Sequence, residues 1–135
     1  AAERAASAVN RFADADLARL GLPPGAVAFV GFSQGATVAL VAGFARGGEC
    51  AGVVAYSGAL AGGRVPATVG GAPPVLLRHG ERDDVVPPVA MEIAARALSE
   101  AGVAVESRLV PGLGHGIDSA GIDRGAAFLG DCFGP

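Results

Sequence analysis

Uncharged residues run without interruption from Leu20 to Ala45, a length that could cross a membrane as a helix. Breaks within the run indicate another structure. It opens with Pro23-Pro24-Gly25, and the sequence GFSQG at 31–35 places polar side chains between two glycines. These breaks predict a buried strand over residues 26–32, a tight turn, and a helix from Gln34 to Arg46. We therefore expect parts of a folded domain here and no membrane span.

The rest of the chain continues this alternation of strands and helices. Short apolar stretches bounded by glycine, proline or polar residues predict three further strands, over residues 52–58, 74–80 and 103–110. Amphipathic spacing predicts three further helices, over residues 1–20, 87–102 and 117–133. Strands that alternate with helices indicate one parallel sheet with right-handed crossovers. The segment 58–74 has no helical period, and we expect a long, flexible connection or a partial lid.

Length and composition limit the class of protein. The 135 residues suffice for one domain, which we place at 1–135. The hydrophobic fraction of 51% comes with only 5% aromatic residues and with 22 glycines, so the core is built from small side chains. All ten cations are arginines scattered along the chain, and the net charge is -3. No basic patch therefore indicates a nucleic-acid partner.

The termini and the cysteines bear on the compartment. The first residues carry acids and bases without an apolar core, which excludes a signal peptide, and the missing initiator Met indicates that something upstream has been removed. Cys50 and Cys132 lie too far apart for a CxxC metal or redox pair. We expect two buried, reduced cysteines in a cytoplasmic protein, with a single disulfide as the alternative.

Polar residues follow three of the predicted strands, where the loops of a parallel sheet open on one edge. Ser33 lies in a Gly-x-Ser-x-Gly sequence between a strand and a helix, and we expect both flanking glycines to remove side chains that would clash in the sharp turn. The turn projects the hydroxyl into open space at a helix N-terminus. His79 and the pair Asp83-Asp84 follow the third strand, and His115 follows the fourth. A nucleophile, an acid and a base thus occur in the order Ser, Asp, His.

The residues leave some assignments open. Gly-x-Ser-x-Gly arises easily by chance in a glycine-rich chain, and its place between strand and helix makes it more specific. We favour His115 as the base because His79 precedes the acids in the same turn, where a structural role explains it better. Asp83 and Asp84 are adjacent, so only one can reach the base. An ordinary ion pair with a neighbouring arginine, Arg78 or Arg82, is the alternative for either.

The sequences GFSQGA, HGERDDVVP and GLGHGID resemble the phospholipase/carboxylesterase family of α/β-hydrolases, which includes acyl-protein thioesterases and small carboxylesterases. The resemblance covers nearly the whole chain. It implies the C-terminal portion of an α/β-hydrolase fold, about four parallel strands flanked by helices. It also implies Ser33 as the nucleophile, His115 as the general base and Asp83 as the acid, with Asp84 in a filler position. The backbone N–H of Gln34 would donate to the oxyanion, and no metal or organic cofactor is needed.

The implied function is hydrolysis of a small-molecule ester or thioester through an acyl-enzyme. The resemblance is to longer chains, in which strands and a helix precede the region matched here and a loop of that part supplies a second oxyanion donor. We therefore expect the strand at 26–32 to form an open apolar sheet edge, which a second copy or a missing N-terminal segment would complete. Small residues in 58–74 indicate an open site for short acyl chains. The alternative function is a binding or assembly module that keeps the turn for structural reasons. A cysteine at position 33 would favour a second enzymatic alternative, dienelactone-type hydrolysis, and Ser33 argues against it.

Overall fold

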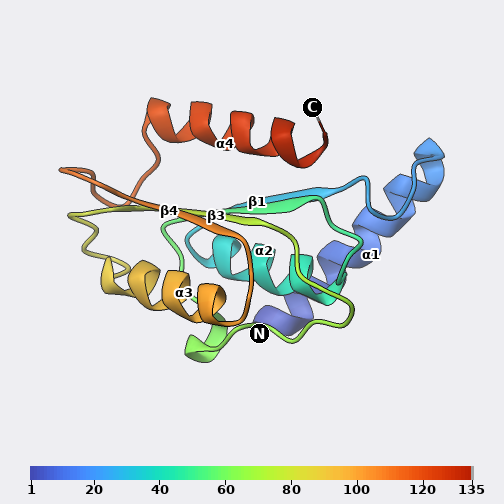
Figure 1. Ribbon diagram of the computed structural model, residues 1–135, viewed down its shortest axis with the longest axis horizontal. Coiled ribbons are helices and arrows are strands. Elements are labelled where there is room, and N and C mark those ends of the chain that lie inside the picture. The colour runs from blue at the N-terminus through green and yellow to red at the C-terminus, as the bar shows by residue number, and fades with distance from the viewer. Residues whose placement is uncertain (135) are drawn as a thin grey trace.

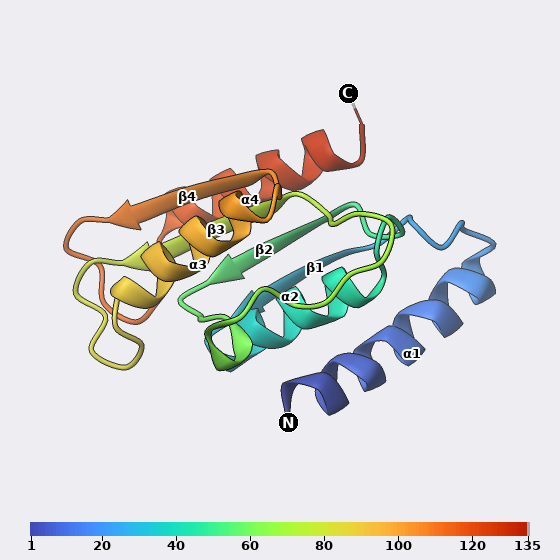
Figure 2. The ribbon, with the colours of Figure 1, turned by 60° about the horizontal axis from the view of Figure 1, so that its bottom comes forward.

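Four parallel strands form a single sheet in the order of the chain. The computed structural model describes residues 1–134. Each strand pairs in parallel with the next, and the strands are β1 (Ala28–Phe32), β2 (Gly52–Tyr56), β3 (Val75–Gly80) and β4 (Val105–Val110). The arrowheads in Figure 2 all point the same way, so the loops that follow the strands open on one edge. The predicted fold class, a parallel sheet flanked by helices, is confirmed.

Helices cover both faces of this sheet. They are α1 (Ala2–Leu20), α2 (Gln34–Ala45), α3 (Val89–Glu100) and α4 (Ser119–Cys132). In Figure 1, α4 lies above the sheet, and α2 and α3 lie below it. α1 packs mainly against α2 on the outer side of that layer, as Figure 2 shows. Because each crossover returns the chain to the same end of the sheet, successive strands bring their loops together.

Some predicted boundaries shift by a few residues. The last helix begins at Ser119 rather than at 117, because the Asp118 side chain accepts a hydrogen bond from the Gly121 N–H at 2.8 Å and so caps the helix. The segment 58–74 is irregular as predicted apart from one 3-10 turn, η1 (Ala61–Gly63). Its first residues are fixed, since the Thr37 hydroxyl donates to the Ala59 carbonyl at 2.7 Å.

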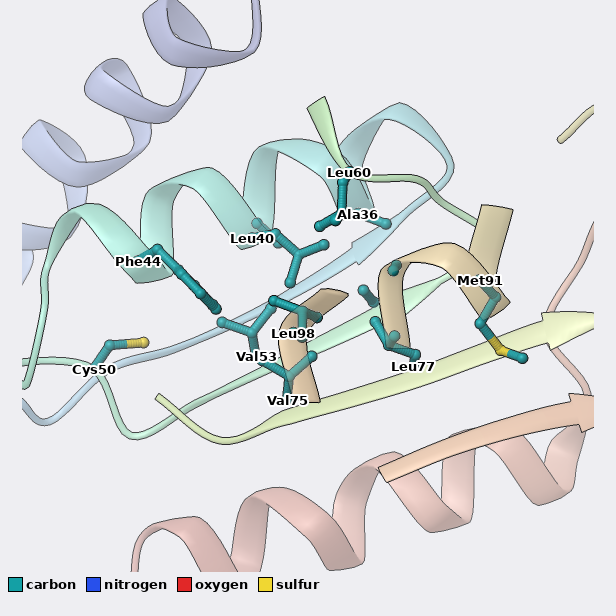
Figure 3. Packing of buried hydrophobic residues seen from close by; sticks show 13 residues of the cluster. Ala36, Leu40, Phe44, Cys50, Val53, Leu60, Val75, Leu77, Met91 and Leu98 are labelled. Carbon is teal, nitrogen blue, oxygen red and sulfur yellow. The ribbon is translucent and has the colours of Figure 1, made fainter. Parts of the chain in front are cut away.

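The main core lies between the sheet and the α2–α3 layer, as Figure 3 shows. Phe44 and Leu98 are fully buried against the strands. Gly43 brings α2 close to the sheet, because a Cβ at this position would lie 2.5 Å from the Val53 side chain. A smaller cluster under α4 contains Val54, Tyr56 and Leu76. The small-residue composition thus allows close packing of helix on sheet.

The uncharged run resolves into β1, the turn at Ser33 and α2. Across residues 1–134, no helix combines the length and the apolar character that crossing a membrane requires. In the sheet formed by the described residues, β1 is an edge strand that pairs with β2 alone. Val30 is 57% and Phe32 40% exposed on the face opposite to Phe29, which packs into the main core. The strand at 26–32 therefore presents the open apolar edge that the family resemblance implies.

The two cysteines carry free thiols. Cys50 is buried as predicted, and burial raises the pKa of its thiol. Cys132, at the end of α4, is only partly buried, so the prediction of two buried cysteines is wrong for this one. Its sulfur packs over Gly52, where a Cβ would lie 2.7 Å from it.

Candidate active site

The turn between β1 and α2 holds Ser33 in a strained backbone conformation. Its φ of 59° and ψ of -120° lie in a region that L-residues rarely adopt, at a cost of about 1–3 kcal/mol. A Cβ at Gly31 would overlap the Gly35 carbonyl, and one at Gly58 would lie 2.9 Å from the Ser33 carbonyl oxygen. A Cβ at Gly35 would meet open space. The expectation that both flanking glycines relieve clashes is therefore wrong for Gly35, whose backbone, not its missing side chain, makes the close approach.

The Ser33 hydroxyl lies at the N-terminal end of α2. Gln34 is the first residue of that helix. The first N–H groups of a helix have no partners within it, and the helix dipole makes this end favourable for negative charge. The backbone N–H of Gln34 is therefore available next to the serine, where the sequence predicted an oxyanion donor.

Hydrogen bonds join the predicted nucleophile, base and acid. Ser33 Oγ is 3.1 Å from His115 Nε2, and His115 Nδ1 is 2.7 Å from Asp83 Oδ2. An ionised carboxylate can only accept, so Nδ1 carries the hydrogen and the neutral ring presents Nε2 as an acceptor to the hydroxyl. The structure thus brings together three residues from loops that follow β1, β3 and β4.

Asp83 is held in place by further hydrogen bonds. Its side chain is fully buried, and Oδ1 accepts from the backbone N–H groups of Val85 and Val86, each at 2.9 Å. Burial would raise the pKa of the Asp83 carboxyl, but the hydrogen bonds from His115, Val86 and Val85 outweigh it and lower the pKa. The carboxylate is thus the stable form.

The neighbouring charged groups lie elsewhere. Asp84 is exposed, so the structure brings Asp83 and not Asp84 to the imidazole. Arg78 points to the other side of the sheet and lies 3.6 Å from Asp118. The ion pair considered as an alternative for the acid is therefore absent at Asp83, among the residues that the structure describes.

The loops that carry the acid and the base are packed against each other. The Arg82 N–H donates to the Leu113 carbonyl at 2.8 Å, and the Glu81 N–H donates to the Val110 carbonyl at 2.9 Å. A Cβ at Gly80 would overlap carbonyl groups of the opposite loop. This contact fixes the two loops relative to each other.

Two neighbours of the site were not anticipated from the sequence. His79 is 1% exposed, and its Nε2 lies 2.8 Å from the Val86 carbonyl oxygen and 3.2 Å from Asp83 Oδ2. No signal in the sequence marks this contact, because β3 is buried at every residue except Arg78 and the pattern does not single out His79. The Phe32 ring packs on the His115 ring, with centroids 4.8 Å apart at 43°.

Two cavities lie on the α2 side of the molecule. One of about 320 Å³ extends from Gln34 and Val38 on α2 to the N-terminal turn of α1. Another, of about 440 Å³, lies between α1, α2 and residues 61–67. Only the first adjoins the candidate site, through Gln34.

A parallel sheet with a strained serine after one strand, and an acid and a histidine after two others, defines the class of α/β-hydrolases. The family model of the phospholipase/carboxylesterase family matches residues 1–132. Acyl-protein thioesterase 1 of Gibberella zeae is 30% identical over 115 residues, and esterase YpfH of Escherichia coli is 36% identical over 99 residues. The crystal structure of esterase PE8 superposes with a TM-score of 0.88 at 36% identity. The chain belongs to the phospholipase/carboxylesterase family.

These similarities cover most of this chain but only part of each relative. The matches span 81% of the chain and 49% of the thioesterase, and 73% of the chain and 42% of the esterase YpfH. For esterase PE8 the shares are 97% and 61%. The chain therefore spans about half the length of the two relatives matched by sequence.

Proposed function

We propose that the protein hydrolyses carboxylic esters or thioesters, with Ser33 as the nucleophile, His115 as the general base and Asp83 as the acid. The observation that carries this proposal is the unbroken series of hydrogen bonds from the Ser33 hydroxyl through the imidazole to a buried carboxylate. The names of the relatives, esterases and a thioesterase, agree with this class of reaction. They give no support to the alternative of a binding or assembly module.

The mechanism proceeds in two acyl-transfer steps. His115 Nε2 takes the proton of Ser33 as its oxygen attacks the carbonyl carbon, and the same nitrogen returns that proton to the leaving alcohol or thiol. Water then attacks the acyl-enzyme while His115 takes a proton from it. His115 gives this proton to the Ser33 oxygen as the carboxylic acid product leaves, which restores the hydroxyl. Asp83 keeps the imidazole in the required tautomer and stabilises the imidazolium that forms in each step.

Negative charge on the carbonyl oxygen requires donors at the site. The N–H of Gln34 supplies one, at the end of α2 where the helix dipole adds to the effect. A single missing donor can cost about a hundredfold in rate. We propose that a strand pairing with the open edge of β1, from a second copy or from further chain of the same protein, brings the second donor. Size-exclusion chromatography with light scattering tests the first source, because a folded monomer at all concentrations would exclude the second copy.

The substrate we propose is an ester or thioester with a short acyl chain. The segment after β2 carries small residues, Ala59 and Ala61 among them, which favour an open site. The cavity that adjoins Gln34 is lined by alanines, a threonine and Val38, which suit an apolar chain of modest size. Acetate and butyrate esters should therefore be cleaved at least as fast as long-chain esters. Much faster cleavage of long-chain esters would refute this choice.

The central test is labelling by a fluorophosphonate probe, read by intact mass. We expect one adduct on the protein, none on Ser33→Ala, and one on Ser107→Ala, a matched control at an exposed serine in β4. Peptide mapping then locates the adduct. No adduct on a chain shown to be folded by circular dichroism would contradict the proposal for this chain.

A further inference from the structure

The buried histidine at the end of β3 has no role in the mechanism above, yet it contacts the proposed acid. His79 Nε2 is 2.8 Å from the Val86 carbonyl oxygen and 3.2 Å from Asp83 Oδ2. A carbonyl oxygen can only accept, so Nε2 must carry the hydrogen. That N–H is donated to the Val86 carbonyl, while Asp83 Oδ2, which accepts the hydrogen bond from His115, is a close neighbour of the same nitrogen.

These contacts close a small network around the acid. Asp83 Oδ1 receives the N–H groups of Val85 and Val86, while the Val86 carbonyl receives the imidazole of His79. Residues 83–86 are thus tied to β3 by a side chain that is 1% exposed. The other carboxylate oxygen, Oδ2, accepts the hydrogen bond from His115 Nδ1 at 2.7 Å.

We propose that His79 is a positioning residue, whose Nε2–H holds the loop 83–86 through the Val86 carbonyl and so keeps Asp83 in the orientation that places Oδ2 on His115. The proposal rests on the function proposed above, because it assigns a role in the same reaction. His79 is too deeply buried to touch substrate, so it acts only through Asp83. His79 Nε2 lies 3.2 Å from Asp83 Oδ2, farther than His115 Nδ1 at 2.7 Å. The hydrogen bond to the Val86 carbonyl is therefore the main interaction of His79 with this loop.

Three substitutions separate this role from simple packing. Gln reaches about as far as the Nε2 position of histidine and keeps an N–H donor, whereas Asn is too short to reach the Val86 carbonyl and Leu has no donor. We expect His79→Gln to keep kcat within about threefold, and His79→Leu and His79→Asn to lose about ten- to a hundredfold, the usual effect of losing a hydrogen bond to a charged or buried group. KM should change little in all three, because the substrate pocket is untouched.

The deciding measurement is proton NMR of the Nδ1–H of His115, which a short bond to a carboxylate moves far downfield. Its signal is assigned by its loss in His115→Ala. We expect the signal in the unaltered protein and in His79→Gln, and its loss or upfield shift in the Asn and Leu variants. If the Leu variant does not fold, the Gln and Asn pair gives the same comparison with two polar side chains.

The outcomes distinguish the two proposals. If the unaltered protein hydrolyses no ester and takes up no probe, the proposed function fails, but the NMR comparison still decides the role of His79. A signal and kcat that persist in His79→Asn would overturn the positioning role. Equal losses of signal and kcat in the Gln and Asn variants would also overturn it, because packing rather than the donor would then be what matters.

Discussion

Replacement of Asp83 by Asn changes the proposed acid with almost no change in shape. Oδ1 accepts two backbone N–H groups, from Val85 and Val86, so the amide oxygen of the variant must occupy that position. The opposite orientation would put an NH2 group against two N–H donors and lose both hydrogen bonds, at about 1–3 kcal/mol each. The NH2 group therefore faces His115.

This orientation places a donor against His115 Nδ1, which at present donates to Oδ2 at 2.7 Å. The imidazole then adopts the other tautomer, with its hydrogen on Nε2, and can no longer take the proton of Ser33. Loss of the correct tautomer in a serine triad lowers kcat by about 10⁴-fold, or about 5 kcal/mol in the activation free energy. The fold should survive, because both backbone hydrogen bonds remain.

Hydrolysis of a p-nitrophenyl ester at saturating substrate measures this loss, and urea unfolding checks the fold. Asp84→Asn is the matched control, since it removes the same charge from the adjacent, exposed residue. The control should keep kcat within about twofold, because surface substitutions change little. An Asp83→Asn variant that retained more than about a tenth of kcat would refute the assignment of tautomer and base.

Three further predictions concern the turn, the ring contact and pH. Gly31→Ala should lower the free energy of urea unfolding by about 1–3 kcal/mol and abolish probe labelling, because its Cβ overlaps the Gly35 carbonyl. Gly35→Ala, whose Cβ meets open space, should change both little. Equal effects of the two substitutions would contradict the geometry of the turn. Phe32→Ala should lower kcat about three- to tenfold, because it removes the ring that packs on the imidazole of His115. Val30→Ala, at an exposed residue of the same strand, should leave kcat unchanged. Steady-state kinetics measures both, and equal values of kcat for the two variants would contradict a role of the ring contact. Because the pKa of Asp83 is lowered in the folded state, its carboxylate stabilises the fold at pH values above the ordinary carboxyl range, and this contribution disappears as pH falls through the lower folded-state pKa. The difference in unfolding free energy between the protein and Asp83→Asn should therefore shrink from about pH 7 to about pH 3. A difference that stays constant would exclude this linkage.

The order of elements could be predicted from the sequence because each strand is bounded by clear breaks. Continuous apolar runs between glycine and proline predict strands that are covered on both faces, which holds for β2, buried along its whole length. The ends were harder to predict, since a cap such as Asp118 depends on one side chain turning back on the backbone. Burial of Cys132 also depends on packing that local pattern does not encode.

The residues of the candidate site were accessible for a different reason. In a parallel sheet, polar residues after successive strands must meet at one edge, so Ser33, His115 and the pair Asp83-Asp84 could be named as candidates from position. The choice of Asp83 over Asp84 came from the family resemblance and not from spacing. The contact of His79 with the acid could not be predicted, because it requires residues 83–86 to fold back onto β3. The ring contact of Phe32 likewise joins the end of β1 to a loop residue, His115, that is distant in sequence.

The packing of the two loops after β3 and β4 has a mechanical consequence. Acid and base are carried by loops joined by backbone hydrogen bonds, so they move as one stiff body. The nucleophile follows β1, which is separated from β3 by β2 and is paired on one side only, among the described residues. Movement of β1 relative to β3 and β4 would therefore change the 3.1 Å contact between Ser33 and His115 before it changes the 2.7 Å contact between His115 and Asp83. A strand added to the free edge of β1 would restrict the movement of β1 and of Ser33 after it. The alignment of Ser33 with His115 would then depend on whether that strand is present.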